Sequence, residues 1–497
     1  MAKNSVKKFA FYRWRFVLGY SLLATVLIGM LTFAALYVPG GISHSEQESV
    51  LKSASLSFSD PDSLLVTDVP YHALQKASLA LFGLTSLSVK LPSLLLAAAA
   101  GAGLIFLLRR WFKPSVSVIT GSIAVVSTPF IFLAQQGTPA IMTIFWPICI
   151  LLLASWSIKK EASKAKYITL PLLGIAAGLS LYTPMNVFLL IALLIGSFLH
   201  PHVRYSIRKS IPKSLLTLAI MLALLVLLPL AYMLYKDPMV GVSLGIASGS
   251  VSFDVLDNLK ILGLQLFDIT GISTTTTGAI TPFFTLPSLL LAIVGAVQLF
   301  KRRHGAQNYL LTAWMILLLP AILLNPYHPE LLFVPLMLLI GIGVANVLDY
   351  WYRLFPLNPY ARAFGLIPVA VLVGGIMLMD SLRYFHTFQY STPLATQSSH
   401  DLSLIKSQVD AATEADRQPI LAVSDTERAF FQLYNDLEHN SELRISTRDE
   451  KPISANTIIA TRESEQAKSD HTPTAVLADR RAGNESDRIY LYKKADE

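Results

Sequence analysis

Eleven apolar runs of about 14 to 23 residues divide the first 380 residues of this 497-residue chain. A helix that crosses a bilayer needs about 20 mostly apolar residues, and several of the runs reach that length. Only 14% of the residues are charged, against about 25% in soluble proteins. The sequence therefore predicts an all-α polytopic membrane protein with about eleven transmembrane helices. The runs cover residues 16–38, 90–108, 115–134, 138–157, 167–182, 184–199, 214–235, 287–300, 309–324, 331–348 and 363–380.

The distribution of Lys and Arg predicts the orientation of these helices. With the N-terminus inside, 21 basic residues lie in the inside segments before residue 380 and 5 lie in the outside segments. Cytoplasmic loops carry such an excess, so we expect a plasma-membrane protein with a cytoplasmic N-terminus. The basic start and the long run 16–38 indicate an uncleaved first helix rather than a signal peptide. The net charge of +8 is then mainly topological and does not imply nucleic acid binding.

Two long loops are expected on the outside, at 39–89 and 236–285. The second contains FDVLDNLKILGLQLFDI, with apolar residues at helical spacing. One interpretation is an interfacial helix that lies on the membrane. The alternative is a loop with a short buried helix.

Residues 381–497 have a different composition and contain no run of spanning length. The stretches PILAVSD, TIIATR, TAVLA and RIYLYKK indicate short strands, and TERAFFQLYNDLEHN indicates an amphipathic helix. We predict a small α/β domain, which eleven spans place outside the cell. The predicted domains are thus 1–380 and 381–497.

The ionisable residues indicate where chemistry could occur. A transporter is expected to place such groups at mid-membrane depth, often near broken helices. Here they collect at the outer ends of the runs and in the outside loops. This favours an enzyme that works at the outer interface over a transporter.

The stretch from Asp68 to Trp156 resembles the GT-C glycosyltransferases, most closely the branch of protein O-mannosyltransferases and lipid A aminoarabinose transferases. The family's P-x-h-x-x-L-x-K-x-x-x-x-L-F-G segment corresponds to Pro70–Gly83, and its Arg-Leu-Pro-Ser to Lys90-Leu91-Pro92-Ser93. The family's Asp-Glu pair corresponds to Ser45-Glu46, so its Asp is replaced. NPYHPELLFVPL, residues 325–336, stands where members often carry an Arg.

The resemblance implies transfer of a sugar, with inversion, from a polyprenyl-phosphate donor in the membrane to an acceptor at the outer face. An outer-loop carboxylate would act as general base, and the phosphate would be the leaving group. The resemblance implies no metal and no cofactor. Membrane lipids are expected partners, and the acceptor could be a protein, a lipid or a wall polymer.

The candidate site residues follow from their type and place in the outside loops. The catalytic candidates are Glu46, Asp68 and Glu48, and the substrate-binding candidates are His72, Lys76, Lys90, His328 and Glu330. Each has a simpler interpretation: the acids as solvated loop residues, the lysines as interface anchors. Two other functions stay open: a non-catalytic scaffold or lipid-binding protein with the same fold, and a transporter for a lipid-linked sugar.

Overall fold

The fold is described from a computed structural model of the chain. The described residues are 10–36, 41–57, 59–158, 163–246, 253–267, 273–274, 280–281, 283–301, 305–354, 359–390, 398–415, 419–438, 443–446, 457–461, 473–477 and 489–493.

The chain divides into two compact units. The helical unit contains residues 1–32, 96–134 and 140–384. The mixed unit contains residues 33–95, 135–139 and 385–497. The first long loop, residues 39–89, thus belongs to the same unit as the C-terminal residues.

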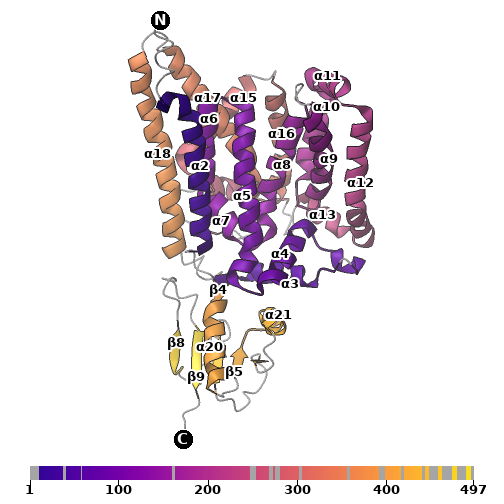
Figure 1. Cartoon of the computed structure of the whole chain (residues 1–497), viewed down its shortest axis with the longest axis vertical. Coiled ribbons are helices and arrows are strands. Elements are labelled where there is room, and N and C mark those ends of the chain that lie inside the picture. The colour runs from indigo at the N-terminus through magenta and orange to yellow at the C-terminus, as the bar shows by residue number, and fades with distance from the viewer. Residues whose placement is uncertain are drawn as a thin grey trace. The chain divides into compact units, whose positions relative to one another are not determined.

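The long helices of the helical unit run side by side as a bundle (Figure 1). Among the described residues, seven helices are long and apolar enough to cross a membrane, two bent pairs pass the same test together, and two apolar helices are shorter. Each of the eleven predicted runs overlaps one of these helices or pairs, which confirms a polytopic helical fold. The elements are α2 (Ala10–Leu36), α5 (Ser86–Trp111), α6 (Pro114–Val126), α7 (Thr128–Gln135), η3 (Pro139–Ile141), α8 (Met142–Ser157), α9 (Ser163–Ser180), α10 (Val187–Leu199), α11 (Pro201–Ser210), α12 (Lys213–Lys236), α13 (Met239–Ile246), α14 (Val255–Phe267), β2 (Ser273–Thr274), β3 (Ile280–Thr281), α15 (Leu286–Lys301), α16 (Ala306–Leu324), η4 (Pro329–Leu332), α17 (Phe333–Leu354) and α18 (Pro359–Tyr390).

Two of these helices, α15 and α17, pack with their backbones in contact. A Cβ added to Gly295 would overlap the carbonyl oxygen of Leu339, and one added to Gly343 would overlap that of Leu291. Small residues permit this close approach, which is common between membrane helices because it increases van der Waals contact.

The helix expected in the second long loop is α14. Its amide side chains, Asn258 and Gln265, are buried, while Leu256 is 80% exposed and Leu259 is 53% exposed. The helix therefore turns most of its leucines outward and its amides toward the protein, with Leu262 buried beside them. That orientation suits an apolar surrounding and fits the interfacial interpretation.

The mixed unit combines short helices with a small sheet. Its elements are β1 (Gly41–Ser43), α3 (His44–Ser55), η2 (Pro61–Leu64), α4 (Val69–Phe82), the first turns of α5, β4 (Ser398–Asp401), α20 (Leu402–Glu414), β5 (Pro419–Ala422), α21 (Arg428–Glu438), β6 (Arg444–Ser446), β7 (Thr457–Ala460), β8 (Ala475–Leu477) and β9 (Ile489–Lys493). The predicted α/β character of the C-terminal residues is confirmed, with strands where their β-branched residues indicated them.

The sheet has the order β6-β5-β7-β9-β8. Strand β5 pairs in parallel with β6 and β7, while β9 pairs antiparallel with β7 and β8. Strand β1 pairs antiparallel with β4, so that Gly41 lies opposite Asp401. One apolar core joins Val50 and Leu79 of the first long loop to Leu421 and Phe431 of the C-terminal residues. Part of the first long loop is therefore packed in a core, while residues 59–62 are exposed.

Candidate functional site

The first long loop begins with a capping box. The Ser43 hydroxyl accepts a hydrogen bond from the backbone N–H of Glu46 at 3.3 Å. In return, Oε2 of Glu46 accepts one from the Ser43 N–H at 2.8 Å. Reciprocal bonds of this kind satisfy donors that the start of a helix otherwise leaves open. They fix Glu46 in the first turn of α3, where 3% of the residue is exposed.

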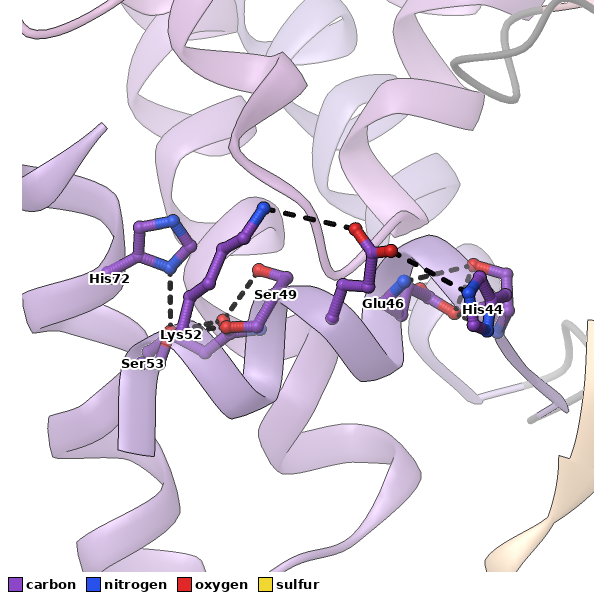
Figure 2. A network of polar contacts seen from close by, with 9 residues as sticks. His44, Glu46, Ser49, Lys52, Ser53 and His72 are labelled. Carbon is purple, nitrogen blue, oxygen red and sulfur yellow. Dashed lines mark hydrogen bonds and ion pairs between the residues drawn. The ribbon is translucent and has the colours of Figure 1, made fainter. Parts of the chain in front are cut away.

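The other carboxylate oxygen of Glu46 reaches a distant segment of the chain. Oε1 accepts a hydrogen bond from the Gly137 N–H at 2.6 Å. Figure 2 shows Glu46 on α3, with Ser49, Lys52 and Ser53 further along the helix and His72 of α4 facing them. The buried carboxylate thus links the start of α3 to residues 135–139.

Gln75 of α4 is fully buried and connects four segments. Its amide nitrogen donates to the carbonyl oxygens of Val89 at 3.1 Å and Gly137 at 2.9 Å. Its amide oxygen accepts from the hydroxyls of Ser49 at 2.8 Å and Ser53 at 2.6 Å. Because both amide protons point to backbone carbonyls, the orientation of the amide is unambiguous.

This orientation assigns the tautomer of His72. The Ser53 hydroxyl has a single proton, and two acceptors already compete for it: the Gln75 amide oxygen at 2.6 Å and the Ser49 carbonyl oxygen at 2.8 Å. The Nδ1 atom of His72, at 2.8 Å from Ser53, must then carry the ring proton and donate it. Nε2 is left as an acceptor. Burial, together with the positive charge of Lys52, lowers the pKa of His72 to about 4, so the ring is neutral at pH 7.

Asp68 and Glu46 lie near the same buried phenol. Asp68 has a left-handed backbone conformation with φ 56°, which is unfavourable for a residue with a side chain, and 6% of it is exposed. Tyr71 is fully buried, with its hydroxyl 2.8 Å from the Ser93 hydroxyl. Burial raises the pKa of Tyr71, and the charges of Glu46 and Asp68 raise it further.

Lys76 contacts the end of α3. Its ammonium group donates to the carbonyl oxygen of Leu56 and, at 3.4 Å, to that of Ala54. A cation is favourable at a helix C-terminus, where backbone carbonyls lack helical partners. The geometry therefore gives Lys76 a capping role, whereas its predicted contact with phosphate stays a prediction.

Glu48 lies on the exposed face of α3. Its carboxylate is 3.6 Å from His44 and 3.8 Å from Lys52, and about half of each side chain is exposed. Exposed pairs of this kind contribute little to stability. Glu48 therefore differs from Glu46, two residues earlier, which is buried.

Lys90 lines a small open pocket in the mixed unit. Ser86, in the first turn of α5, and Gln135 supply further polar groups. The remaining lining residues are apolar: Ala34, Ala35, Leu87 and Leu94. A cation, a helix N-terminus and an apolar wall suit an anionic group attached to a lipid chain.

His328 and Glu330 lie in the helical unit. His328 Nδ1 is 2.9 Å from Oε1 of Glu330, and 2% of Glu330 is exposed. Among the described residues, Oε2 of Glu330 has no hydrogen-bond partner. A buried carboxylate with an open oxygen attracts hydroxyl or ammonium groups and repels phosphate.

The mixed unit brings together six of the predicted site residues. They are Glu46, Glu48, Asp68, His72, Lys76 and Lys90. The sequence interpretation missed Tyr71, Gln75 and Gly137, which connect the buried members of this set. The spacing Ser43-x-x-Glu46 was a readable signal for the capping box. Nothing in the sequence linked Gly137 to a residue 91 positions away.

Comparison with known proteins gives similar folds at low sequence identity. The family model described as dolichyl-phosphate-mannose-protein mannosyltransferase matches residues 69–232. A comparison with curated protein sequences finds no significant match.

The structure of ArnT from Cupriavidus metallidurans bound to undecaprenyl phosphate is similar, with a TM-score of 0.52 and 12% identity over 96% of this chain and 98% of ArnT. Its apo state gives a TM-score of 0.51 at 13% identity, with the same coverage. The Archaeoglobus fulgidus oligosaccharyltransferase with a tethered acceptor peptide gives 0.50 at 13% identity, over 88% of this chain and 64% of that one.

Proposed function

Because the chain has the fold of the GT-C membrane glycosyltransferases, we propose that it transfers a sugar from a polyprenyl-phosphate donor to an acceptor hydroxyl. The reaction takes place at the outer face of the plasma membrane, with the N-terminus in the cytoplasm. The observation that carries the proposal is the pocket of Lys90, where a cation lies beside an apolar wall. ArnT, whose fold is similar, has been crystallised with undecaprenyl phosphate.

The Lys90 pocket would hold the phosphate of the donor. Lys90 and the N-terminus of α5, at Ser86, stabilise negative charge on the phosphate as the bond to the sugar breaks. The apolar wall accommodates the first part of the polyprenyl chain. Glu330 would accept a hydrogen bond from a hydroxyl group of a substrate, since its open carboxylate oxygen suits such a donor, while His328 contacts its other oxygen.

A carboxylate of the first long loop would act as general base. It takes the proton of the acceptor hydroxyl while the hydroxyl oxygen attacks the anomeric carbon, and the phosphate leaves from the opposite side with inversion. We assign this role first to Asp68, which is buried and has a strained left-handed backbone, a combination that is typical of functional sites. Glu46 is second, because three donors from Ser43 and Gly137 already occupy its oxygens.

One observation favours a non-catalytic scaffold instead. Ser45 stands where the family that this chain resembles has Asp. The oxygens of Glu46 accept hydrogen bonds from the protein's own backbone. A protein of this kind would bind the lipid phosphate without transferring the sugar.

The test combines lipid binding with transfer. Purified protein is incubated with polyprenyl phosphates and with their glycosylated forms, and bound lipid and glycosylated products are identified by mass spectrometry. Transferase function predicts both a bound lipid and a new glycosidic bond. It further predicts that Asp68→Asn slows transfer by about 100-fold or more, the range typical for loss of a general base.

Glu48→Gln is the matched control, because Glu48 is an exposed acid of the same loop. Lipid binding without product would support the scaffold. Loss of transfer in Glu46→Gln but not in Asp68→Asn would move the base to Glu46.

A further inference from the structure

Gly137 is held at both of its backbone polar groups. Its N–H donates to Glu46 at 2.6 Å and its carbonyl oxygen accepts from Gln75 at 2.9 Å. Both partner side chains are buried, at 3% and 0% exposure. Backbone groups in loops more often bond to other backbone or to water. Because two buried side chains bond to this one loop residue, its backbone is held in a fixed position.

The same glycine packs directly against Val89. A Cβ at Gly137 would lie 2.6 Å from Cγ1 of Val89 and 2.9 Å from its carbonyl oxygen. Gln75 donates to that carbonyl as well, at 3.1 Å. The two backbones are therefore fixed against each other, and no larger residue fits between them.

The residues beside this contact line the Lys90 pocket. Gln135 lies two positions before Gly137, and Lys90 follows Val89 directly. Both side chains are part of the pocket wall. The contact between Gly137 and Val89 thus lies within two residues of both Gln135 and Lys90 along the chain.

We propose that Gln75 and Gly137 are positioning residues for the donor phosphate, which hold Gln135 and Lys90 at the spacing that binds it. The proposal rests on the proposed function for the identity of the ligand. Neither residue needs to touch the lipid. They affect the affinity for the phosphate group of the lipid. The effect can therefore be measured by binding alone, without the transfer reaction.

The experiment measures the Kd of the full-length protein for undecaprenyl monophosphate in detergent, by native mass spectrometry titration. Gly137→Ala inserts a methyl group into the Val89 contact, and we expect at least tenfold weaker binding. Gln75→Glu keeps the shape of the side chain but places a carboxylate oxygen against two carbonyl oxygens. We expect a loss of affinity of similar size for this variant.

Two controls separate positioning from general destabilisation. Gly196→Ala, in α10, adds a methyl group where no atom lies within 4 Å, so binding should be unchanged. Ser49→Ala removes a hydrogen bond to Gln75 but leaves both backbone carbonyls bonded. It should lower the melting temperature without changing the Kd.

The outcomes distinguish the two proposals. If the unmodified protein does not bind the lipid, the proposed function fails. If it binds, and Gly137→Ala and Gln75→Glu bind equally well while remaining folded, the positioning proposal is overturned. The positioning proposal is also overturned if Ser49→Ala weakens binding as much as Gly137→Ala and Gln75→Glu do.

Discussion

Two buried glutamates of this protein have opposite surroundings. Both oxygens of Glu46 accept hydrogen bonds, from Ser43 and Gly137. Glu330 uses one oxygen for His328, and its other oxygen has no partner among the described residues. A buried acceptor without a partner costs about 1–3 kcal/mol. Such a cost is expected where a ligand later supplies the donor. The hydrogen bonds of Glu46 stabilise the fold, whereas we expect Glu330 to bind a hydroxyl group of a substrate.

The largest effect is expected from His72, on the pH dependence of the free energy of unfolding. An exposed imidazole titrates near pH 6.5, whereas burial lowers the pKa of His72 to about 4. Between these values the unfolded chain binds more protons than the folded one. The free energy of unfolding therefore falls as the pH decreases from about 6.5 to 4, by up to about 3 kcal/mol. Thermal unfolding of the protein and of His72→Gln across this range measures the effect. Equal pH dependence in both proteins would show that His72 does not contribute.

Glu330→Gln tests the substrate side of the comparison. The amide replaces one acceptor oxygen, and we expect transfer to slow by about 100-fold, or about 2.7 kcal/mol of transition-state stabilisation. The melting temperature should change little, because Oε2 has no partner to lose. A variant that unfolds more easily but transfers normally would make Glu330 a structural residue like Glu46.

Glu46→Gln tests the structural side. One amide hydrogen must now face a backbone N–H of Ser43 or Gly137, so we expect a loss of about 1–3 kcal/mol in the free energy of unfolding. Chemical denaturation in detergent measures it. Normal stability combined with abolished transfer would instead identify Glu46 as the base.

The smallest effect is expected for Glu48→Gln. Its contacts with His44 and Lys52 are long and solvated, so stability should change by less than about 0.5 kcal/mol. Transfer should be unchanged in the same assay. A clear loss of transfer would place substrate on the exposed face of α3.

The sequence was sufficient for the features that depend on local pattern. Each apolar run became a helix or a bent pair of helices, because burial in lipid requires a continuous apolar segment. The β-branched stretches became strands β5, β7, β8 and β9. The role of Gln75 was not accessible in this way. Its partners lie 14, 22, 26 and 62 positions away along the chain. A single Gln in an apolar helix forms no repeating pattern from which these contacts could be predicted. The strain at Asp68 was equally hidden, since no glycine marks that turn.

The pairing of β1 with β4 has a consequence for biosynthesis. Gly41 emerges from the ribosome early and must wait for Asp401, its partner in the sheet, until more than three quarters of the chain has been made. Val50 and Leu79 likewise lack Leu421 and Phe431 during that time. Contacts so distant in sequence form late and slowly. The first long loop therefore lacks its packing partners while the intervening helices are inserted. Truncation anywhere before residue 401 leaves it exposed to aggregation and proteolysis.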